Sequence, residues 1–135
     1  MEHRKQWRIH PQAKKEFEEL PSNGRQGLAE LMVRVRRGEA VLPREQDNYG
    51  RGLYGLKYSE ARNEFRCYYG RDGRHGQYLV AVEFVYKTTE SIALDTARAR
   101  LKAWKEVGEA RRRAQREEGG GSQKRNAWTP IGRDR

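Results

Sequence analysis

Three cations and one tyrosine in the middle of the chain are the residues whose types could carry out chemistry. Lys57, Arg66 and Lys87 lie in three successive blocks of mixed apolar and polar residues, and Tyr86 directly precedes the last of them. Fixed positive charges stabilise the negative charge that gathers on phosphate oxygens in a transition state. A guanidinium matches phosphate geometry, and a desolvated lysine can transfer a proton. Lys57, Arg66, Tyr86 and Lys87 are therefore our candidate catalytic residues.

Such a group could cut RNA without a metal ion. The deprotonated 2′-hydroxyl attacks the neighbouring phosphorus and the 5′-oxygen leaves, which produces a cyclic phosphate. Arg66 is the first candidate for stabilising the phosphate charge, because it lies in the middle of a predicted strand and so has a rigid support. Lys57 and Lys87 would share the charge or transfer protons. Tyr86 or Tyr68 could stack on a base or act as an acid.

Several further residues lie in or near the connections between these blocks and could hold an RNA backbone. Each such cation would steepen the salt dependence of binding. A solvated, solubilising charge is the alternative for any single one of them. The candidate RNA-binding residues are Arg44, Arg51, Arg62, Tyr68, Arg71 and Arg74. The three histidines have no metal-ligand spacing, so neither a metal nor another cofactor is expected.

The three blocks predict an antiparallel meander that would position the cations. They cover residues 52–58, 63–69 and 77–88, are rich in aromatic and β-branched residues, and are separated by short polar connections. Side chains alternate between the two faces of a strand. If the apolar set faces a core, Lys57 and Arg66 project together from the opposite face, with Lys87 near them.

The rest of the chain predicts helices around this sheet. An edge strand over 6–10 precedes a helix over 11–20, and a second helix ends at Gly38. Residues 39–51 are predicted to be a loop, and Thr89 is predicted to cap a third helix. The predicted buried residues of that third helix are Ala97, Leu101, Trp104, Ile92 and Leu94. The order β-α-α-β-β-β-α gives an α+β fold, in which a small antiparallel sheet packs against an N-terminal helical hairpin and a C-terminal helix.

Composition and charge divide the chain into a folded domain and a tail. Residues 1–107 have the pattern of one domain, and residues 108–135 form a polar, basic, flexible tail. The net charge is +10, of which the tail carries +4 from eight Lys and Arg against four Asp and Glu. The remaining +6 lies on the domain, which favours a polyanionic partner such as nucleic acid. A basic protein that merely repels itself is the alternative.

The cysteine content and the hydropathy predict the compartment. Cys67 is the only cysteine, which excludes an intramolecular disulfide and fits a reducing environment. Because Cys67 lies inside a predicted strand, it is expected to be a small core residue. There is no apolar run of membrane-spanning length and no apolar signal segment, so we predict a cytoplasmic protein without a membrane partner.

The ordered set of these blocks resembles the RelE/ParE superfamily of toxin–antitoxin toxins, and most of all its HigB-type and phage-derived branch. The resemblance covers about residues 5–105. It is carried by a helical hairpin ending in Leu42-Pro43 and by four further segments in order. These are Gly-Leu-Tyr-Gly-Leu-Lys (52–57), Glu-Phe-Arg-Cys-Tyr-Tyr (64–69), Val-Glu-Phe-Val-Tyr-Lys-Thr-Thr (82–89) and Ala97-x-x-Arg100.

The resemblance implies a small ribonuclease that cuts messenger RNA at the ribosome and is held inactive by a cognate antitoxin, with a helix-turn-helix protein as one candidate. The chain departs from the family pattern at three positions: Gly55 stands where an acid is usual, Lys57 where Arg is usual, and Tyr86 before Lys87 where two lysines are usual. Two alternatives follow. One is a ParE-like toxin that binds DNA gyrase without cleaving nucleic acid, and the other is a degenerate relative that only binds an antitoxin or RNA.

Overall fold

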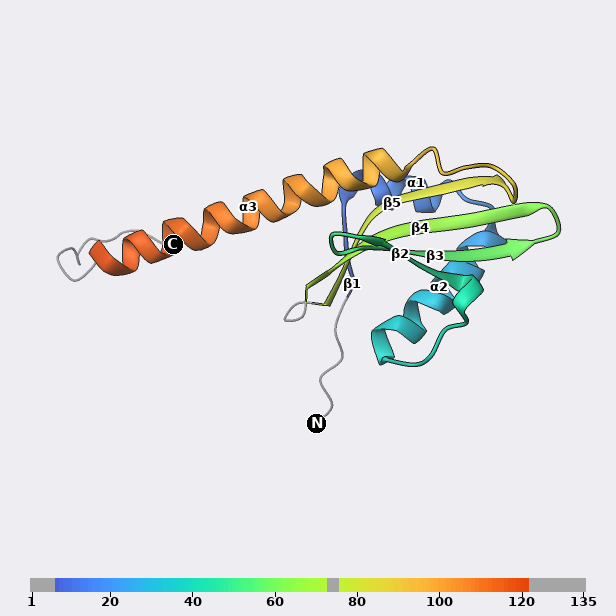
Figure 1. Ribbon diagram of the computed structural model, residues 1–135, viewed down its shortest axis with the longest axis horizontal. Coiled ribbons are helices and arrows are strands. Elements are labelled where there is room, and N and C mark those ends of the chain that lie inside the picture. Colours follow the sequence, from blue (N-terminus) through green and yellow to red (C-terminus); the bar gives the residue numbers. More distant parts are fainter. Residues whose placement is uncertain (1–6, 73–75, 122–135) are drawn as a thin grey trace. The chain divides into compact units, whose positions relative to one another are not determined.

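The computed structural model of the protein describes residues 7–72 and 76–121. The chain divides into two compact units, residues 1–101 and 102–135. The first unit contains one sheet of five strands in the order β1-β5-β4-β3-β2 (Figure 1). The strands are β1 (Trp7–Ile9), β2 (Gln46–Gly50), β3 (Leu53–Glu60), β4 (Asn63–Asp72) and β5 (Gly76–Tyr86). The helices are α1 (Pro11–Glu18), α2 (Ser22–Arg37), the 3-10 turn η1 (Pro43–Glu45) and α3 (Leu94–Gly121).

The predicted α+β fold and the central meander are confirmed. β3 pairs with β4 and β4 with β5, both antiparallel, and the short N-terminal strand β1 lies at the sheet edge, parallel to β5. The second helix ends at Gly38, whose φ of +75° is left-handed and suits glycine, as predicted. Alternation along the strands and helical spacing are local patterns, and the structure keeps both.

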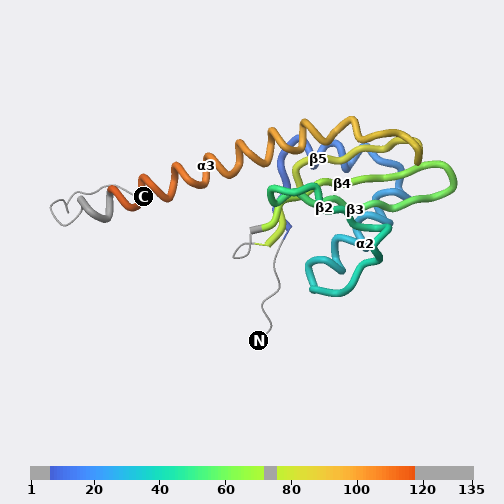
Figure 2. Tube along the Cα trace, in the orientation of Figure 1, coloured from blue at the N-terminus to red at the C-terminus, as the bar shows by residue number. Residues whose placement is uncertain are grey.

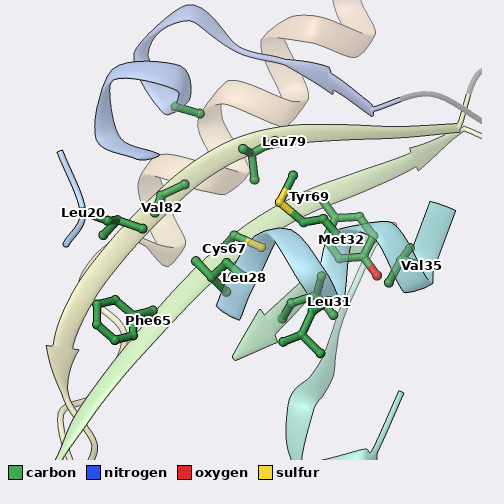
Figure 3. Packing of buried hydrophobic residues seen from close by; sticks show 12 residues of the cluster. Leu20, Leu28, Leu31, Met32, Val35, Phe65, Cys67, Tyr69, Leu79 and Val82 are labelled. Carbon is green, nitrogen blue, oxygen red and sulfur yellow. The ribbon is translucent and has the colours of Figure 1, made fainter. Parts of the chain in front are cut away.

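The core lies between α2, α1 and one face of the sheet. Figure 3 shows Leu28, Leu31 and Met32 of α2 gathered against Cys67 and Tyr69 of β4. Cys67 is fully buried, which raises the pKa of its thiol to about 12 and fits its predicted role as a small core residue. The core therefore occupies one face of the sheet. On the opposite face, Lys57 and Arg66 lie on the same strands as the buried side chains of Leu53 and Tyr68.

Two predicted boundaries are wrong. Residues 39–51 are not a continuous loop, because Gln46–Gly50 form β2, whose trace runs beside β3 (Figure 2). Gln, Asp and Asn have low strand propensity, and it is the edge of β3 that supplies the pairing. Thr89 does not cap α3, which begins at Leu94. The carbonyl of Thr89 instead accepts a hydrogen bond from Arg66, so residues 87–93 are held as a loop.

The predicted buried face of the third helix is correct only in part. Ala97 and Leu101 are buried, and Leu101 packs against Gly70 of β4. Ile92, predicted to be buried, is 74% exposed, because it lies in the loop before the helix. Beyond residue 107, where the apolar pattern fades, α3 continues as a helix to Gly121.

Gly24 and Gly27 allow α2 to approach Phe65 and Tyr58 of the sheet closely. This close approach predicts the effect of adding one methyl group. A Cβ on Gly27 would lie 2.3 Å from a ring carbon of Tyr58, which itself stacks on Phe65. Gly27→Ala improves helix propensity by about 1 kcal/mol, but overpacking costs about 1–3 kcal/mol. We expect a net loss of about 1 kcal/mol in the free energy of unfolding, measured by urea denaturation.

The matched control is Gly108→Ala, a substitution in α3 where the added Cβ meets only an ordinary contact with Arg112 at 3.6 Å. This control should be neutral or stabilising. A Gly27→Ala protein at least as stable as the parent would show that the ring of Tyr58 yields without cost.

Candidate functional site

The strand register brings two of the predicted cations side by side. Lys57 on β3 is the direct partner of Arg66 on β4, and Arg66 is the direct partner of Glu83 on β5. Directly opposite side chains on neighbouring strands have Cβ atoms about 5 Å apart. Both cations alternate with core residues, so they lie on the sheet face opposite α1 and α2. Their placement is therefore as the alternation indicates, and their chemical role stays a prediction.

Arg66 is buried and uses its guanidinium nitrogens within the fold. Its side chain is only 8% exposed. Nε donates to Glu64 Oε2 at 2.6 Å, Nη1 to Glu83 Oε2 at 3.3 Å and Nη2 to the carbonyl of Thr89 at 2.6 Å. Burial acts to lower the pKa of Arg66, but the hydrogen bond and the charge of Glu64 outweigh it, so the pKa is raised. Arg66 therefore remains a cation that ties three segments together.

Glu83 extends this network to the loop before α3. Its Oε2 accepts hydrogen bonds from the hydroxyls of Tyr68 and Ser91, and its Oε1 accepts one from the backbone N–H of Ile92 at 3.2 Å. Tyr68 is fully buried, and burial together with the hydrogen bond to Glu83 raises its pKa. In this structure the ring of Tyr68, a predicted base-stacking residue, is covered, and the loop over 87–93 is fastened to the sheet.

Lys57 has a different environment, because β2 supplies its partner. Its Nζ lies 3.0 Å from Asp47 Oδ2, and the side chains of Lys57 and Asp47 are 27% and 35% exposed. The hydroxyl of Tyr49 donates to the same oxygen of Asp47 at 3.2 Å. Burial, followed by the charge and hydrogen bond of Asp47, raises the pKa of Tyr49 to about 12. Lys57 is thus a charged group that a ligand can reach.

Gly55 makes room for this arrangement. It is the direct strand partner of Asp47, and a Cβ at this position would lie 2.9 Å from the ring of Tyr49. The ring of Tyr49 also packs against that of Tyr68 at 5.7 Å between centroids. Gly55 stands where the resembled family usually has an acid, and here the ring of Tyr49 from β2 covers it.

Asp47 and Tyr49 were not predicted as site residues. They were missed because residues 39–51 were predicted to be a loop, and a predicted loop does not indicate which side chains face the sheet. The available signal was that Asp47 and Tyr49 are two residues apart, since alternate residues of a strand share a face. That signal is weak in a segment whose composition indicates a turn.

Tyr86 and Lys87 lie near the end of the hairpin. Tyr86 pairs with Asn63, which is three residues before Arg66 along β4, or about 10 Å along the strand. Because this offset is odd, Tyr86 lies on the same side of the sheet as Phe65 and Phe84, opposite the side that carries Arg66 and Lys57. Tyr86 is 68% exposed, and Lys87 is also exposed. Tyr86 lines a pocket of about 390 Å³ together with Asn63, Phe84, Val85 and Thr89. The chain then folds back, which brings the carbonyl of Thr89 to Arg66.

The predicted RNA-binding arginines are spread over the unit. Arg51 and Arg62 occupy the turns at opposite ends of β3, and Arg44 lies in η1. Arg71 alternates with Cys67 and Tyr69, so it is on the core side of the sheet, where its guanidinium lies 4.6 Å from the ring centre of Tyr54. Arg74 lies outside the described residues. Of the described arginines, Arg51, Arg62 and Arg71 therefore lie at different places on the sheet.

Within residues 7–72 and 76–121, no group of three or more His, Cys, Asp and Glu side chains could hold a metal ion. No helix in that part of the chain has the length and apolar character needed to cross a bilayer.

Comparison with known proteins places this arrangement in a family. No protein-family model matches the sequence. The chain is 34% identical over 95 residues to the probable endoribonuclease HigB1 of two Mycobacterium tuberculosis strains, a match that covers 70% of this chain and 75% of each relative. A free double-arginine mutant of the Escherichia coli toxin RelE superposes with a TM-score of 0.54 and 16% identity, over 75% of this chain and 98% of RelE.

A second solved structure gives the same fold. It is the same RelE mutant in complex with a peptide of its antitoxin RelBc, with a TM-score of 0.50 and 18% identity over 70% of this chain and 95% of that one. At these identities the solved structures establish the fold, whereas the HigB1 relatives establish the family. The chain belongs to the HigB-like branch of the RelE/ParE superfamily of toxins.

Proposed function

We propose that this protein is the toxin of a type II toxin–antitoxin system and acts as an endoribonuclease that cleaves messenger RNA at the ribosome and so stops translation. The observation that carries the proposal is the accessible ammonium of Lys57, directly across the strands from the permanently charged Arg66. The HigB1 relatives, described as probable endoribonucleases, support the same activity class. The ammonium of Lys57 lies on the face that α1 and α2 do not cover, and a positive charge there can contact a phosphodiester backbone.

In the proposed reaction the 2′-hydroxyl of a nucleotide attacks the adjacent phosphorus, and a cyclic phosphate and a 5′-hydroxyl result. Lys57 contacts a non-bridging phosphate oxygen. Arg66 is buried and stabilises the phosphate charge at a distance. It contacts the phosphate directly only if a phosphate oxygen replaces the carbonyl of Thr89 as the acceptor of Nη2. Lys87, exposed directly after β5, contributes its charge to the flanking nucleotide. No metal or other cofactor takes part in this scheme.

The proposal includes a partner that restrains the toxin. RelE has been solved in complex with a peptide of its antitoxin RelBc. We propose a cognate antitoxin, with a helix-turn-helix protein as one form, whose acidic side chains cover the face that carries Lys57. A toxin domain over 1–107, a basic tail over 108–135 and a cytoplasmic location are also parts of this proposal.

Inducible expression in growing bacteria tests the activity. We expect growth arrest and internal cleavage of translated transcripts within minutes, mapped by primer extension, while untranslated RNA stays intact. Arrested DNA replication with intact transcripts would instead favour the gyrase-binding alternative. Normal growth together with intact transcripts, at a verified protein level, would contradict both functions.

A further inference from the structure

Asp47 presents a carboxylate oxygen beside the ammonium of Lys57, on the sheet face opposite α1 and α2. Both contacts of Asp47 go to Oδ2: the ion pair with Lys57 at 3.0 Å and the hydrogen bond from Tyr49 at 3.2 Å. Within the described parts of the chain, Oδ1 of Asp47 has no hydrogen-bond or ion-pair partner, and the ammonium of Lys57 has none besides Asp47. One acceptor of Asp47 and two N–H donors of Lys57 thus remain unpaired next to each other, on side chains that are 35% and 27% exposed.

This pair is complementary to the reacting part of a ribonucleotide. The 2′-hydroxyl is a donor, and the non-bridging oxygens of the neighbouring 3′-phosphate are acceptors. Oδ1 of Asp47 can accept from the hydroxyl while Lys57 donates to the phosphate. We propose that Asp47 is the general base of RNA cleavage in this protein, an inference that rests on the ribonuclease function proposed above.

The step balances with water as the only further reactant. The proton of the 2′-hydroxyl moves to Oδ1 of Asp47 as the 2′-oxygen forms its bond to phosphorus. The bond from phosphorus to the 5′-oxygen breaks, and that oxygen takes a proton from solvent water. Asp47 then returns its proton to the hydroxide so formed, which restores the carboxylate and leaves a 2′,3′-cyclic phosphate and a 5′-hydroxyl.

The other acids of this face are not equivalent to Asp47. Glu64 and Glu83 are each 7% exposed, and both accept hydrogen bonds from the guanidinium of Arg66. Protonating either one would remove the counter-charge of a buried cation, which is costly. Asp47 differs from both, because its side chain is 35% exposed and its ion-pair partner Lys57 is itself 27% exposed. Tyr49 orients the carboxylate through Oδ2, so Oδ1 is the oxygen that meets a substrate.

The test is Asp47→Asn, which preserves the shape of the side chain but cannot take the proton. Cleavage is measured with purified protein on ribosomes carrying a defined messenger, under single-turnover conditions. We expect a loss of about a hundredfold in the cleavage rate, the lower range for a general base, with affinity for the messenger complex equal or higher. Asp47→Glu, which keeps a carboxylate, should retain more activity than Asp47→Asn.

Glu39→Gln is the matched control, because it removes the same charge from an exposed pair with Arg37 at 3.8 Å and should leave the rate unchanged. A messenger with a 2′-deoxy nucleotide at the cleavage site should bind and stay intact. Circular dichroism confirms that each variant is folded, and the comparison of the Glu and Asn variants remains decisive if the Asn variant is less stable.

The outcomes separate this inference from the proposed function. If the wild-type protein cleaves no messenger, the ribonuclease function itself fails. If the wild type cleaves and Asp47→Asn cleaves equally fast, the function stands and Asp47 is not the base. Tighter messenger binding with an undiminished rate would show that Asp47 is only a counter-ion that competes with phosphate for Lys57. Equal losses in the Asn and Glu variants would also overturn the inference.

Discussion

Arg66→Ala should lower the free energy of unfolding by roughly 3–5 kcal/mol, the cost of removing one partner from a buried ion pair. The substitution leaves Glu64 and Glu83 buried without their counter-charge and removes the hydrogen bond that holds the carbonyl of Thr89. Burial decides the size of the effect, because Glu64 and Glu83 are each only 7% exposed and so are poorly solvated. Urea denaturation followed by circular dichroism measures it.

Arg62→Ala is the matched control, since this arginine is exposed in the turn between β3 and β4 and its replacement should change stability by no more than about 0.5 kcal/mol. Arg66→Lys should fall between the two, because an ammonium keeps the charge but cannot reach three acceptors in the geometry of a guanidinium. An Arg66→Ala protein as stable as the Arg62→Ala protein would show that Glu64 and Glu83 find other partners.

The position of Arg66 affects how activity measurements are interpreted. Loss of toxicity in Arg66→Ala can result from unfolding as well as from a missing phosphate contact. A variant at this position therefore tests catalysis only when the folded fraction is measured with it. Lys57 is the better probe of chemistry, because it lies on the same face and is accessible to solvent.

Lys57→Ala should reduce the rate of messenger cleavage about a hundred- to a thousandfold, as expected for the removal of one stabiliser of transition-state charge. Its stability should change by less than about 1 kcal/mol, because the pair with Asp47 is partly exposed and such pairs contribute little. Single-turnover cleavage on programmed ribosomes gives the rate, and urea denaturation gives the stability.

Two further variants control this experiment. Lys14→Ala removes an exposed charge from α1, far in sequence from the sheet face, and should cleave at the wild-type rate. Lys57→Arg restores the charge and should recover a substantial part of the activity. If Lys57→Ala cleaves as fast as Lys14→Ala, the face that carries Lys57 is not where the phosphate is bound.

Local sequence patterns were enough to predict the fold class and the central hairpins. Alternation has a period of two and helices have a period of 3.6, so Lys57 and Arg66 could be assigned to the face opposite Leu56 and Cys67. Strand pairing through tight turns then fixed them as neighbours. These predictions succeeded because each depends on residues that are close together in the chain.

The predictions that failed depend on contacts between distant segments. β2 forms because the free edge of β3 accepts it, although Gln46, Asp47 and Asn48 have little strand preference of their own. The late start of α3 has the same cause, since Arg66 and Glu83 bind the segment before it. A helix-capping residue such as Thr89 is a weak signal when a buried cation competes for its backbone.

The sequence by itself determined that Lys57 and Arg66 would share one face of a central meander, because alternation separates them from the apolar set. Only the tertiary structure decided how they differ: Arg66 is covered by the loop over 87–93 and paired with two buried carboxylates, while Lys57 stays accessible beside Asp47. The physical reason is that burial depends on which distant segment covers a strand, and burial sets whether a charge supports the fold or can meet a ligand.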